Sequence, residues 1–288
     1  MKPGRIGLIT GSGLYEIEGL ETIEQREIET PFGAPSDAFT IGRLAGREVV
    51  FLRRHGPGHR IMPSELNFRA NIFGFKLLGV DRIIATGTVG SLREEIHPLD
   101  VVIPDQFVDR TWGRASTFFG DGIVGHIAFG DPVCAGLSDA LFKAATASGA
   151  RVHKGGTYVC MEGPALSTRG ESELYRKWGM DIIGMTNLQE AKLAREAEIC
   201  YASIALVTDY DCWHPLEAGV TVDMILENMR RNLKTAKAIL KRVLTDMPDV
   251  EDCPCRRALA GAIITSRDAI PAETLRKLEP IVGKYLKG

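Results

Sequence analysis

Short apolar runs alternate along the chain with segments whose apolar residues recur every three or four positions. Several of the runs are almost continuously apolar and rich in Val and Ile, which is typical of strands covered on both faces. We therefore predict strands at residues 5–10, 47–53, 82–87, 101–108, 156–161, 181–185 and 200–207.

The periodic segments predict helices. In NLQEAKLAREA, Asn187 is the expected N-cap, and Glu190, three residues later, completes a capping box. In the last segment Pro271 stands near the start, a position that suits the first turn of a helix. The predicted helices span residues 64–79, 187–197, 221–245 and 271–286.

This alternation of strands and helices indicates an α/β fold in which helices sandwich a central sheet. The stretch DMPDVEDCPC (246–255) is acidic, contains prolines and separates the last two predicted helices, as a linker does. We predict one domain at residues 1–245, followed by a C-terminal extension at 246–288 with a Cys-x-Cys pair and the terminal helix.

The bulk composition narrows the class of protein. The chain has 288 residues, of which 44% are hydrophobic and 25% charged, as is ordinary for a globular protein. The net charge of −2 is too small to indicate a nucleic-acid or membrane-surface partner. No apolar run approaches the about 20 residues that span a bilayer, and the N-terminal run is too short for a secretory signal. We expect a cytoplasmic protein with no nucleic-acid or membrane partner.

The six cysteines are spread along the chain, which suits reduced thiols in the cytoplasm better than a disulfide framework. Cys253 and Cys255 form a Cys-x-Cys pair, which supplies two ligands where a structural zinc wants four. We therefore expect a solvent-exposed thiol pair and no metal site.

Loops that follow four of the predicted strands are rich in hydrogen-bond donors. Glycines in these loops free backbone amides, and Ser12, Arg54, His55 and Thr186 add side-chain donors. Taken alone, each loop is equally well explained as a tight turn or a solvated surface loop. Because ligands collect at the carboxyl ends of strands in open α/β sheets, the four together predict one site for an oxyanion about the size of phosphate. The loops are TGSGLYE (10–16), RRHGPGHR (53–60), ATGTVGS (85–91) and GMTN (184–187).

Two acids follow the last predicted strand. In VTDYDCW (207–213), Asp209 and Asp211 lie one residue apart between apolar flanks, and strand alternation would point them the same way. Two carboxylates that lie so near each other do not both ionise easily, so one is expected to hold a proton near neutral pH. A metal is the rival explanation, but only His214 lies near enough in sequence to be a third ligand.

These residues lie in motifs that resemble the purine nucleoside phosphorylase superfamily and, within it, the 5′-methylthioadenosine phosphorylases. The matching motifs run in order from residue 5 to about residue 245. They are GSGLYE, TPFGAPSD, RHGPGHRIMPSELNFRANI, VGSLREEI, PDQFVDRT, MEGPALSTRGES, GMTNLQEAKLA and CYASIALVTDYDCW. The resemblance implies the nucleoside phosphorylase fold, a central mixed β-sheet flanked by helices.

The resemblance also implies an activity. Phosphate would cleave the N-glycosidic bond of 5′-methylthioadenosine to give adenine and 5-methylthioribose 1-phosphate, a reaction of purine and methionine salvage. No cofactor is implied, because inorganic phosphate is a co-substrate. The implied partners are the nucleoside, phosphate and further copies of the chain in a homotrimer or a dimer of trimers.

The resemblance assigns roles to individual residues. Asp209 would protonate and hold the departing base, and Asp211 would support it and face the exocyclic amine. Met185 would lie against the ribose, and His126 matches a residue that completes the pocket of a neighbouring subunit. The implied phosphate contacts are Ser12, Arg54, His55, Gly87, Thr88 and Thr186, and the other implied substrate contacts are Leu166, Ser167, Val222, Ile225 and Leu226.

The sequence departs from the family pattern at several positions of the implied site. Ala165 and Leu166 stand where the family usually has Arg and Phe, and Gly87–Thr88 stands where an alanine commonly follows a hydroxyl residue. These departures leave adenosine and 6-oxopurine nucleosides such as methylthioinosine open as substrates. An alternative of another class is a non-catalytic or redox nucleotide-binding protein, against which the missing glycine fingerprint argues.

Overall fold

The computed structural model describes residues 4–11, 19–214, 222–247 and 252–286, with side chains throughout except at 222–225. The strands are β1 (Arg5–Thr10), β2 (Glu21–Arg26), β3 (Phe39–Leu44), β4 (Arg47–Arg53), β5 (Val80–Ser91), β6 (Val101–Ile103), β7 (Gln106–Arg110), β8 (Val152–Lys154), β9 (Thr157–Met161), β10 (Ile182–Gly184) and β11 (Cys200–Asp209). The helices are α1 (Phe68–Leu77), α2 (Ala135–Ala147), α3 (Arg169–Lys177), α4 (Asn187–Glu196), α5 (Val222–Thr245) and α6 (Ala272–Leu286), and two of the short 3-10 helices are η3 (Asp211–Trp213) and η4 (Pro254–Arg257).

The described strands form one mixed sheet centred on β5. Strands β4, β1, β5 and β11 lie side by side and run parallel. Beyond the end of β1, the last residues of β5 pair antiparallel with β10. The sheet therefore divides into one branch through β10, β9 and β7 and another through β11, β6 and β8. This division brings the carboxyl ends of four parallel strands and the end of β10 to one region.

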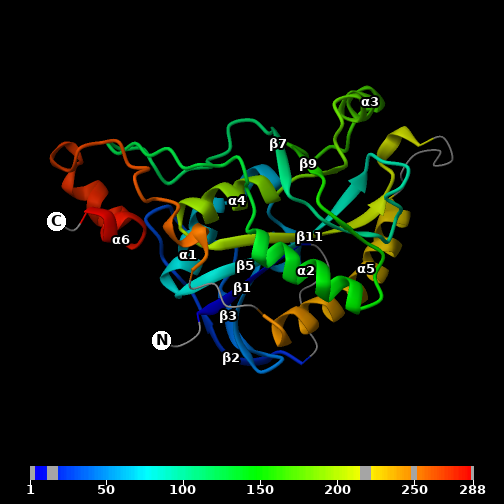
Figure 1. Cartoon of the computed structure of the whole chain (residues 1–288), viewed down its shortest axis with the longest axis horizontal. Coiled ribbons are helices and arrows are strands. Elements are labelled where there is room, and N and C mark those ends of the chain that lie inside the picture. Colours follow the sequence, from blue (N-terminus) through cyan, green and yellow to red (C-terminus); the bar gives the residue numbers. More distant parts are fainter. Residues whose placement is uncertain (1–3, 12–18, 215–221, 248–251, 287–288) are drawn as a thin grey trace.

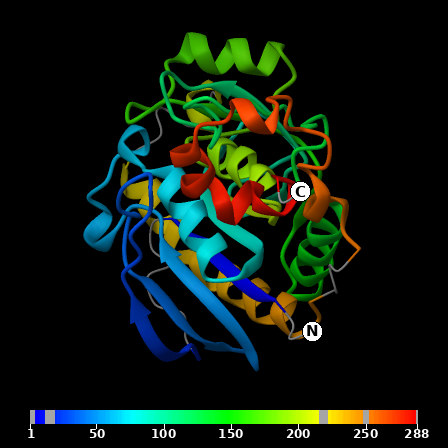
Figure 2. The same cartoon turned by 90° about the vertical axis from the view of Figure 1, so that its left-hand side faces the viewer.

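Helices cover both faces of the sheet (Figure 1). Ile9 and Ile83 point to a core shared with α1, α4 and α6, whereas their neighbours Leu8 and Ile84 point to a core shared with α2 and α5. The near-continuous hydrophobicity of these strands follows from burial on both faces. Figure 2 shows α6 lying beside α1 on one face, so the end of the chain completes the helical layer there.

The predicted fold class is confirmed, with differences in individual elements. All of the predicted strands and helices are present, but residues 101–108 form two strands instead of one. Pro104 lies between β6 and β7, and proline has no N–H to donate to a sheet. Three strands and two helices were not predicted: β2, β3, β8, α2 and α3. Strand β2 is exposed along its whole length, so its sequence carries no apolar pattern.

The predicted capping box at α4 is wrong. Thr186 is the N-cap, and Asn187 is the first helical residue. The Asn187 side chain donates to the Tyr201 hydroxyl at 2.8 Å, and Glu190 pairs with Arg54 instead of with the helix end. Both residues that resemble a capping box therefore contribute to a buried polar network.

The expectation of a solvent-exposed Cys-x-Cys pair is also wrong. Cys255 is 7% exposed and Cys253 is half-buried, and both pack against the α2–α5 side of the core. The C-terminal segment is thus part of the folded core from η4 onward. The division at residue 245 remains a prediction. Among the described residues, no helix has the length and apolar character needed to cross a membrane.

Candidate active site

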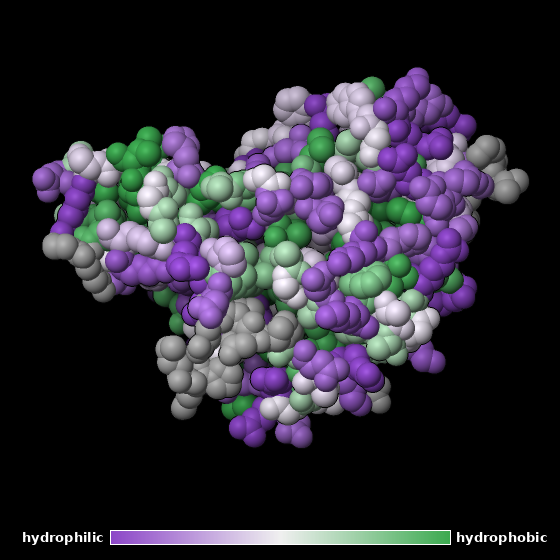
Figure 3. All heavy atoms as spheres, in the orientation of Figure 1, coloured by the Kyte–Doolittle hydropathy of each residue, from purple (hydrophilic) through white to green (hydrophobic). Residues whose placement is uncertain are grey.

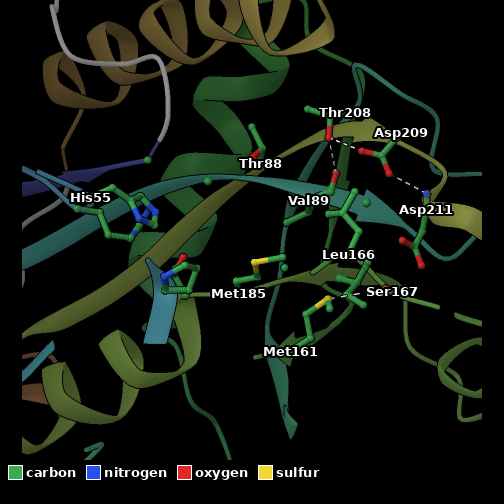
Figure 4. Close-up of a pocket in the computed structure, with 18 of the residues that line it drawn as sticks. His55, Thr88, Val89, Met161, Leu166, Ser167, Met185, Thr208, Asp209 and Asp211 are labelled. Carbon is green, nitrogen blue, oxygen red and sulfur yellow. Dashed lines mark hydrogen bonds between the residues drawn. The ribbon is translucent and has the colours of Figure 1, made fainter. Parts of the chain in front are cut away.

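A cavity of about 380 Å³ opens where the parallel strands end. Its size falls in the range of small-molecule sites, and its position is that expected for ligands in open α/β sheets. It brings together ten of the residues predicted from the sequence, namely Arg54, His55, Gly87, Thr88, Leu166, Ser167, Met185, Thr186, Asp209 and Asp211. Figure 4 shows His55 at one end of this cavity, Asp209 and Asp211 at the other, and Met185 between them.

Arg54 directly follows β4 and is held by a buried ion pair. Its Nε lies 2.5 Å and its Nη2 3.0 Å from the two carboxylate oxygens of Glu190, on α4. Its Nη1 donates to the Thr86 carbonyl at 2.8 Å. A Cβ on Gly11 would lie 3.1 Å from Nη1, so the glycine lets the loop after β1 approach the guanidinium. Arg54 thus faces the cavity mainly through Nη1, while Glu190 fixes its orientation.

His55, next to Arg54 in the cavity wall, is a second group that can form a hydrogen bond with a ligand. Its Nδ1 lies 2.8 Å from the Ile61 carbonyl, which can only accept, so Nδ1 carries the proton and Nε2 is left for a ligand. Burial, and next the adjacent Arg54, lower the pKa of His55 to about 4. The ring also stacks on His59, with 4.2 Å between centroids. The imidazole is therefore neutral near pH 7 in the ligand-free protein.

Small residues and an α-helix N-terminus complete this end of the cavity. Gly87 and Thr88 belong to β5, and Thr186 is the N-cap of α4. Backbone N–H groups at a helix start have no partner within the helix and favour anions. The arrangement offers neutral and cationic donors to an oxyanion.

The two acids at the other end lie in different backbone settings. Asp209 is the last residue of β11, whereas Asp211 begins η3 with a φ of 53°, so strand alternation is not what brings them together. Asp209 accepts hydrogen bonds from the Thr208 hydroxyl at 2.6 Å and from the Asp211 N–H at 2.8 Å. A Cβ on Gly90 would lie 3.0 Å from Oδ1 of Asp209, so this glycine makes room for the carboxylate.

Asp211 is the acid whose surroundings oppose ionisation. Burial raises the pKa of Asp211 above its ordinary value and outweighs the opposing contribution of the Ser172 and Ser167 hydroxyls. Its Oδ2 is buried and makes no hydrogen bond to any described residue. A buried acceptor without a partner is costly, so this oxygen is suited to a ligand donor.

Leu166 and Ser167 lie on the loop after β9, at the edge of the cavity. Leu166 is 55% exposed while still lining the cavity, so it is a rim residue. The Ser167 hydroxyl lies 3.7 Å from the sulfur of Met161 (Figure 4). This part of the wall is largely apolar.

Two asparagines on α5 support the acidic end and were missed by the sequence analysis. Asn228 donates to the Thr208 carbonyl at 2.6 Å, and Asn232 donates to the Val207 carbonyl at 2.8 Å. These hydrogen bonds hold the last residues of β11 in place next to Asp209. The only signal in the sequence is their spacing of four residues on one helix face.

Of the other predicted site residues, two are described and do not line the cavity, and the side chains of three lie outside the described part of the structure. Ser12 and the side chains of Val222 and Ile225 lie outside the described residues. Leu226 is 41% exposed on α5, and His126 is exposed on a loop where its N–H donates to the Ala262 carbonyl at 2.9 Å. Neither side chain lines the cavity.

Known proteins match the chain over most of its length. A family model described as the phosphorylase superfamily matches residues 5–245. The chain is 57% identical over 280 residues to the S-methyl-5′-thioadenosine phosphorylase of Koribacter versatilis, covering 97% of this chain and 96% of the relative.

Two solved structures are similar over almost the whole chain. One is a methylthioadenosine phosphorylase sourced from an antarctic soil metagenomic library, with a TM-score of 0.90, 45% identity and coverage of 98% of this chain and 99% of that one. The other is the methylthioadenosine phosphorylase from Schistosoma mansoni in complex with adenine, with a TM-score of 0.86, 37% identity and coverage of 90% and 98%.

Proposed function

The chain belongs to the phosphorylase superfamily, and from that premise we propose that it is a phosphorylase of 5′-methylthioadenosine. A phosphate oxygen attacks C1′ of the ribose while the C1′–N bond to the base breaks. The products are 5-methylthioribose 1-phosphate and adenine. One observation carries the proposal: a single cavity holds donors for an oxyanion at one end and two carboxylic acids at the other (Figure 4).

The oxyanion end is suited to phosphate. Arg54 is fixed by Glu190 and directs Nη1 toward the loops, and His55 offers Nε2. Since His55 is neutral in the free site, a phosphate that carries a proton can donate to Nε2. Thr88 and Thr186 add hydroxyls, and the start of α4 adds amides. No cofactor is needed, because phosphate supplies the nucleophile.

The middle of the cavity suits the sugar. Glycosidic cleavage passes through a cation-like ribose, with the bonding electron pair leaving on the base. Met185 lies between the two ends and presents a polarizable, uncharged surface to this ring (Figure 4). Phosphate beside C1′ stabilises the developing positive charge electrostatically as its oxygen bonds to this carbon.

The acidic end suits adenine. Asp209 delivers a proton to a ring nitrogen of the departing base, which neutralises the negative charge that builds there. Asp211 supports the base and accepts a hydrogen bond from the 6-amino group on its unpartnered Oδ2. A 6-oxopurine presents a lone pair at that point instead, and such polar matching discriminates by about 10⁴ or more. The pair therefore selects adenine nucleosides.

The site is completed by a second copy of the chain in a homotrimer. His126 is exposed and lies beside two exposed apolar side chains, Val124 and Ile264, whose backbones pair at 3.0 Å. Figure 3 shows hydrophobic side chains at the surface of the projecting part of the molecule that contains α6. Such a patch suits an interface that brings His126 to a neighbouring cavity.

The free thiols among the described residues fit a reducing cytoplasm.

The decisive experiment measures base release by the purified full chain from methylthioadenosine, adenosine, methylthioinosine and inosine, each with and without phosphate. We expect adenine from methylthioadenosine only when phosphate is present, with the highest kcat/KM of the four. No phosphate-dependent adenine would contradict the proposed reaction. A preference for the inosine compounds would contradict the role given to Asp211, and a preference for adenosine would contradict the proposed selection of a 5′-methylthio group.

A further inference from the structure

Four cysteines from three distant parts of the chain meet at one point. Cys134 precedes the first turn of α2, Cys200 begins β11, and Cys253 and Cys255 flank the start of η4. The four sulfur atoms all lie within 4.8 Å of one another, and those of Cys134 and Cys253 are 3.6 Å apart. Three of the four residues are buried and Cys253 is half-buried.

The spacing of the sulfurs matches a tetrahedral metal site. Four thiolates at about 2.3 Å from a zinc ion lie about 3.8 Å from each other. The Cys134–Cys253 separation of 3.6 Å is close to that value and far beyond the about 2.05 Å of a disulfide bond. The Cys-x-Cys pair supplies two ligands, and the core supplies the two that the sequence analysis could not identify.

The cluster lies in an apolar setting. Cys134, Cys200 and Cys255 lie within the core between α2 and α5. A divalent ion deprotonates the thiols that coordinate it, so an ion at this point would be held by thiolates that balance its charge locally.

We propose that Cys134, Cys200, Cys253 and Cys255 bind one zinc ion. Four protein ligands leave no open coordination position, which is the arrangement of a structural zinc and not of a catalytic one. Cys200 and Asp209 are at opposite ends of the ten-residue strand β11, so the ion lies about 30 Å from the acids. The ion fastens the segment that leads to α6 onto the α/β core.

The proposal is tested on the full chain from cells grown without added metal. The protein is purified under argon in buffers that contain no chelator. Elemental analysis should find close to one zinc per chain in a protein with no visible colour. A mercurial that blocks thiols should release the zinc to a chromogenic indicator. Iron in stoichiometric amount, with visible absorption, would overturn the assignment to zinc.

Variants separate the cluster from the other thiols. Cys253→Ser changes the half-buried ligand and should lower the zinc content well below one per chain, with a melting temperature lower by about 5 °C or more. Cys212→Ser removes a half-buried thiol outside the cluster and should leave the zinc content unchanged. A Cys253→Ser protein that keeps a full zinc would overturn the proposal.

Thiol counting covers the alternative states of the unmodified protein. After denaturation in the presence of a chelator, the zinc form should show all six thiols. Six thiols with no zinc in the purified protein would mean a bare thiol cluster, and a loss of thiols in pairs would mean disulfides; either result overturns the proposal.

Discussion

Asp209 and Asp211 differ in what the protein already provides to each. Asp209 accepts two hydrogen bonds from Thr208 and the Asp211 N–H, whereas Asp211 has a buried oxygen without a described partner. In the proposed reaction the protein orients the first carboxylate, and the ligand completes the second. The proposal therefore separates positioning of the proton donor from recognition of the base.

We predict that Asp209→Asn lowers kcat by about 10²–10⁴-fold with little change in melting temperature, because the substitution removes a transferable proton and keeps the side-chain volume. The comparison is Asp211→Asn, which should mainly raise KM for adenine nucleosides because its new NH₂ group opposes the 6-amino group. Steady-state kinetics of both variants measures the split. The reverse pattern would assign proton transfer to Asp211, whose pKa burial already raises.

His55 predicts a pH dependence of stability. Burial and Arg54 lower its pKa from 6.5 to about 4, so between these values the unfolded chain holds a proton that the folded chain lacks. The free energy of unfolding therefore falls as pH falls from 6.5 to about 4, by up to about 3 kcal/mol from this residue. It is unaffected by His55 above pH 6.5.

Urea unfolding of the wild type and His55→Gln, without phosphate, at pH 7 and pH 4.5 measures this contribution. The pKa of Glu196 is raised by burial to about 7, so this residue makes the free energy of unfolding rise as pH falls over part of the same range. Only the difference between the two proteins therefore isolates the contribution of His55. We expect the wild type to lose more stability than the variant on acidification. Equal losses would mean that the imidazole is not held neutral.

At the scale of elements, one buried ion pair joins β4 to α4. The Arg54 side chain is 1% exposed and its Glu190 partner is buried, and Glu190 also accepts from the Tyr201 hydroxyl of β11 at 2.8 Å. Arg54 therefore depends on α4 for both its charge balance and its direction. Replacing Arg54 itself would disturb the proposed phosphate site and the core together.

We predict that Glu190→Gln costs about 3–5 kcal/mol of unfolding free energy, because it leaves the Arg54 cation buried without a counter-charge. Its KM for phosphate should also rise as Arg54 loses its orientation. The control is Glu227→Gln, which breaks an exposed pair with Arg230 on α5 and should cost less than about 1 kcal/mol. Equal costs for the two variants in chemical denaturation would contradict this account.

The elements also show how far the sequence leads. Strand-end loops could be predicted because apolar runs and glycines are local patterns, and the ends of parallel strands must meet at one edge. Asn228 and Asn232 could not, because a polar residue on a helix shows nothing locally of the carbonyls it will reach. The cysteine cluster needs the chain to return to β11 after α5, so two of its four ligands were invisible from the spacing of the others. Strand β2 could not be predicted for a third reason, because an exposed edge strand needs no apolar alternation.

For the whole molecule, the segment before α6 is attached to the rest of the chain at three points. Its Cys-x-Cys pair meets the start of β11, and residues beyond it pair with the loop that carries His126. Glu198, just before β11, accepts from the Leu259 N–H at 3.1 Å and so adds a third fixed point. The C-terminal segment thereby holds the surface proposed to face a neighbouring subunit.

That arrangement predicts the effect of a charge at the proposed interface. Ile264 is 65% exposed beside Val124, and Ile264→Glu should break a trimer whose mass is three times the 31.5 kDa of one chain. The matched control is Ile23→Glu on β2, where an isoleucine is 59% exposed far along the sheet edge and the trimer should persist. Size-exclusion chromatography with light scattering measures both. With His126 no longer brought to a neighbouring cavity, the Ile264→Glu protein should show a KM for methylthioadenosine raised about tenfold, equivalent to about 1.4 kcal/mol of binding energy. A monomeric wild type, or an Ile264→Glu monomer with unchanged KM, would mean that each chain completes its own site.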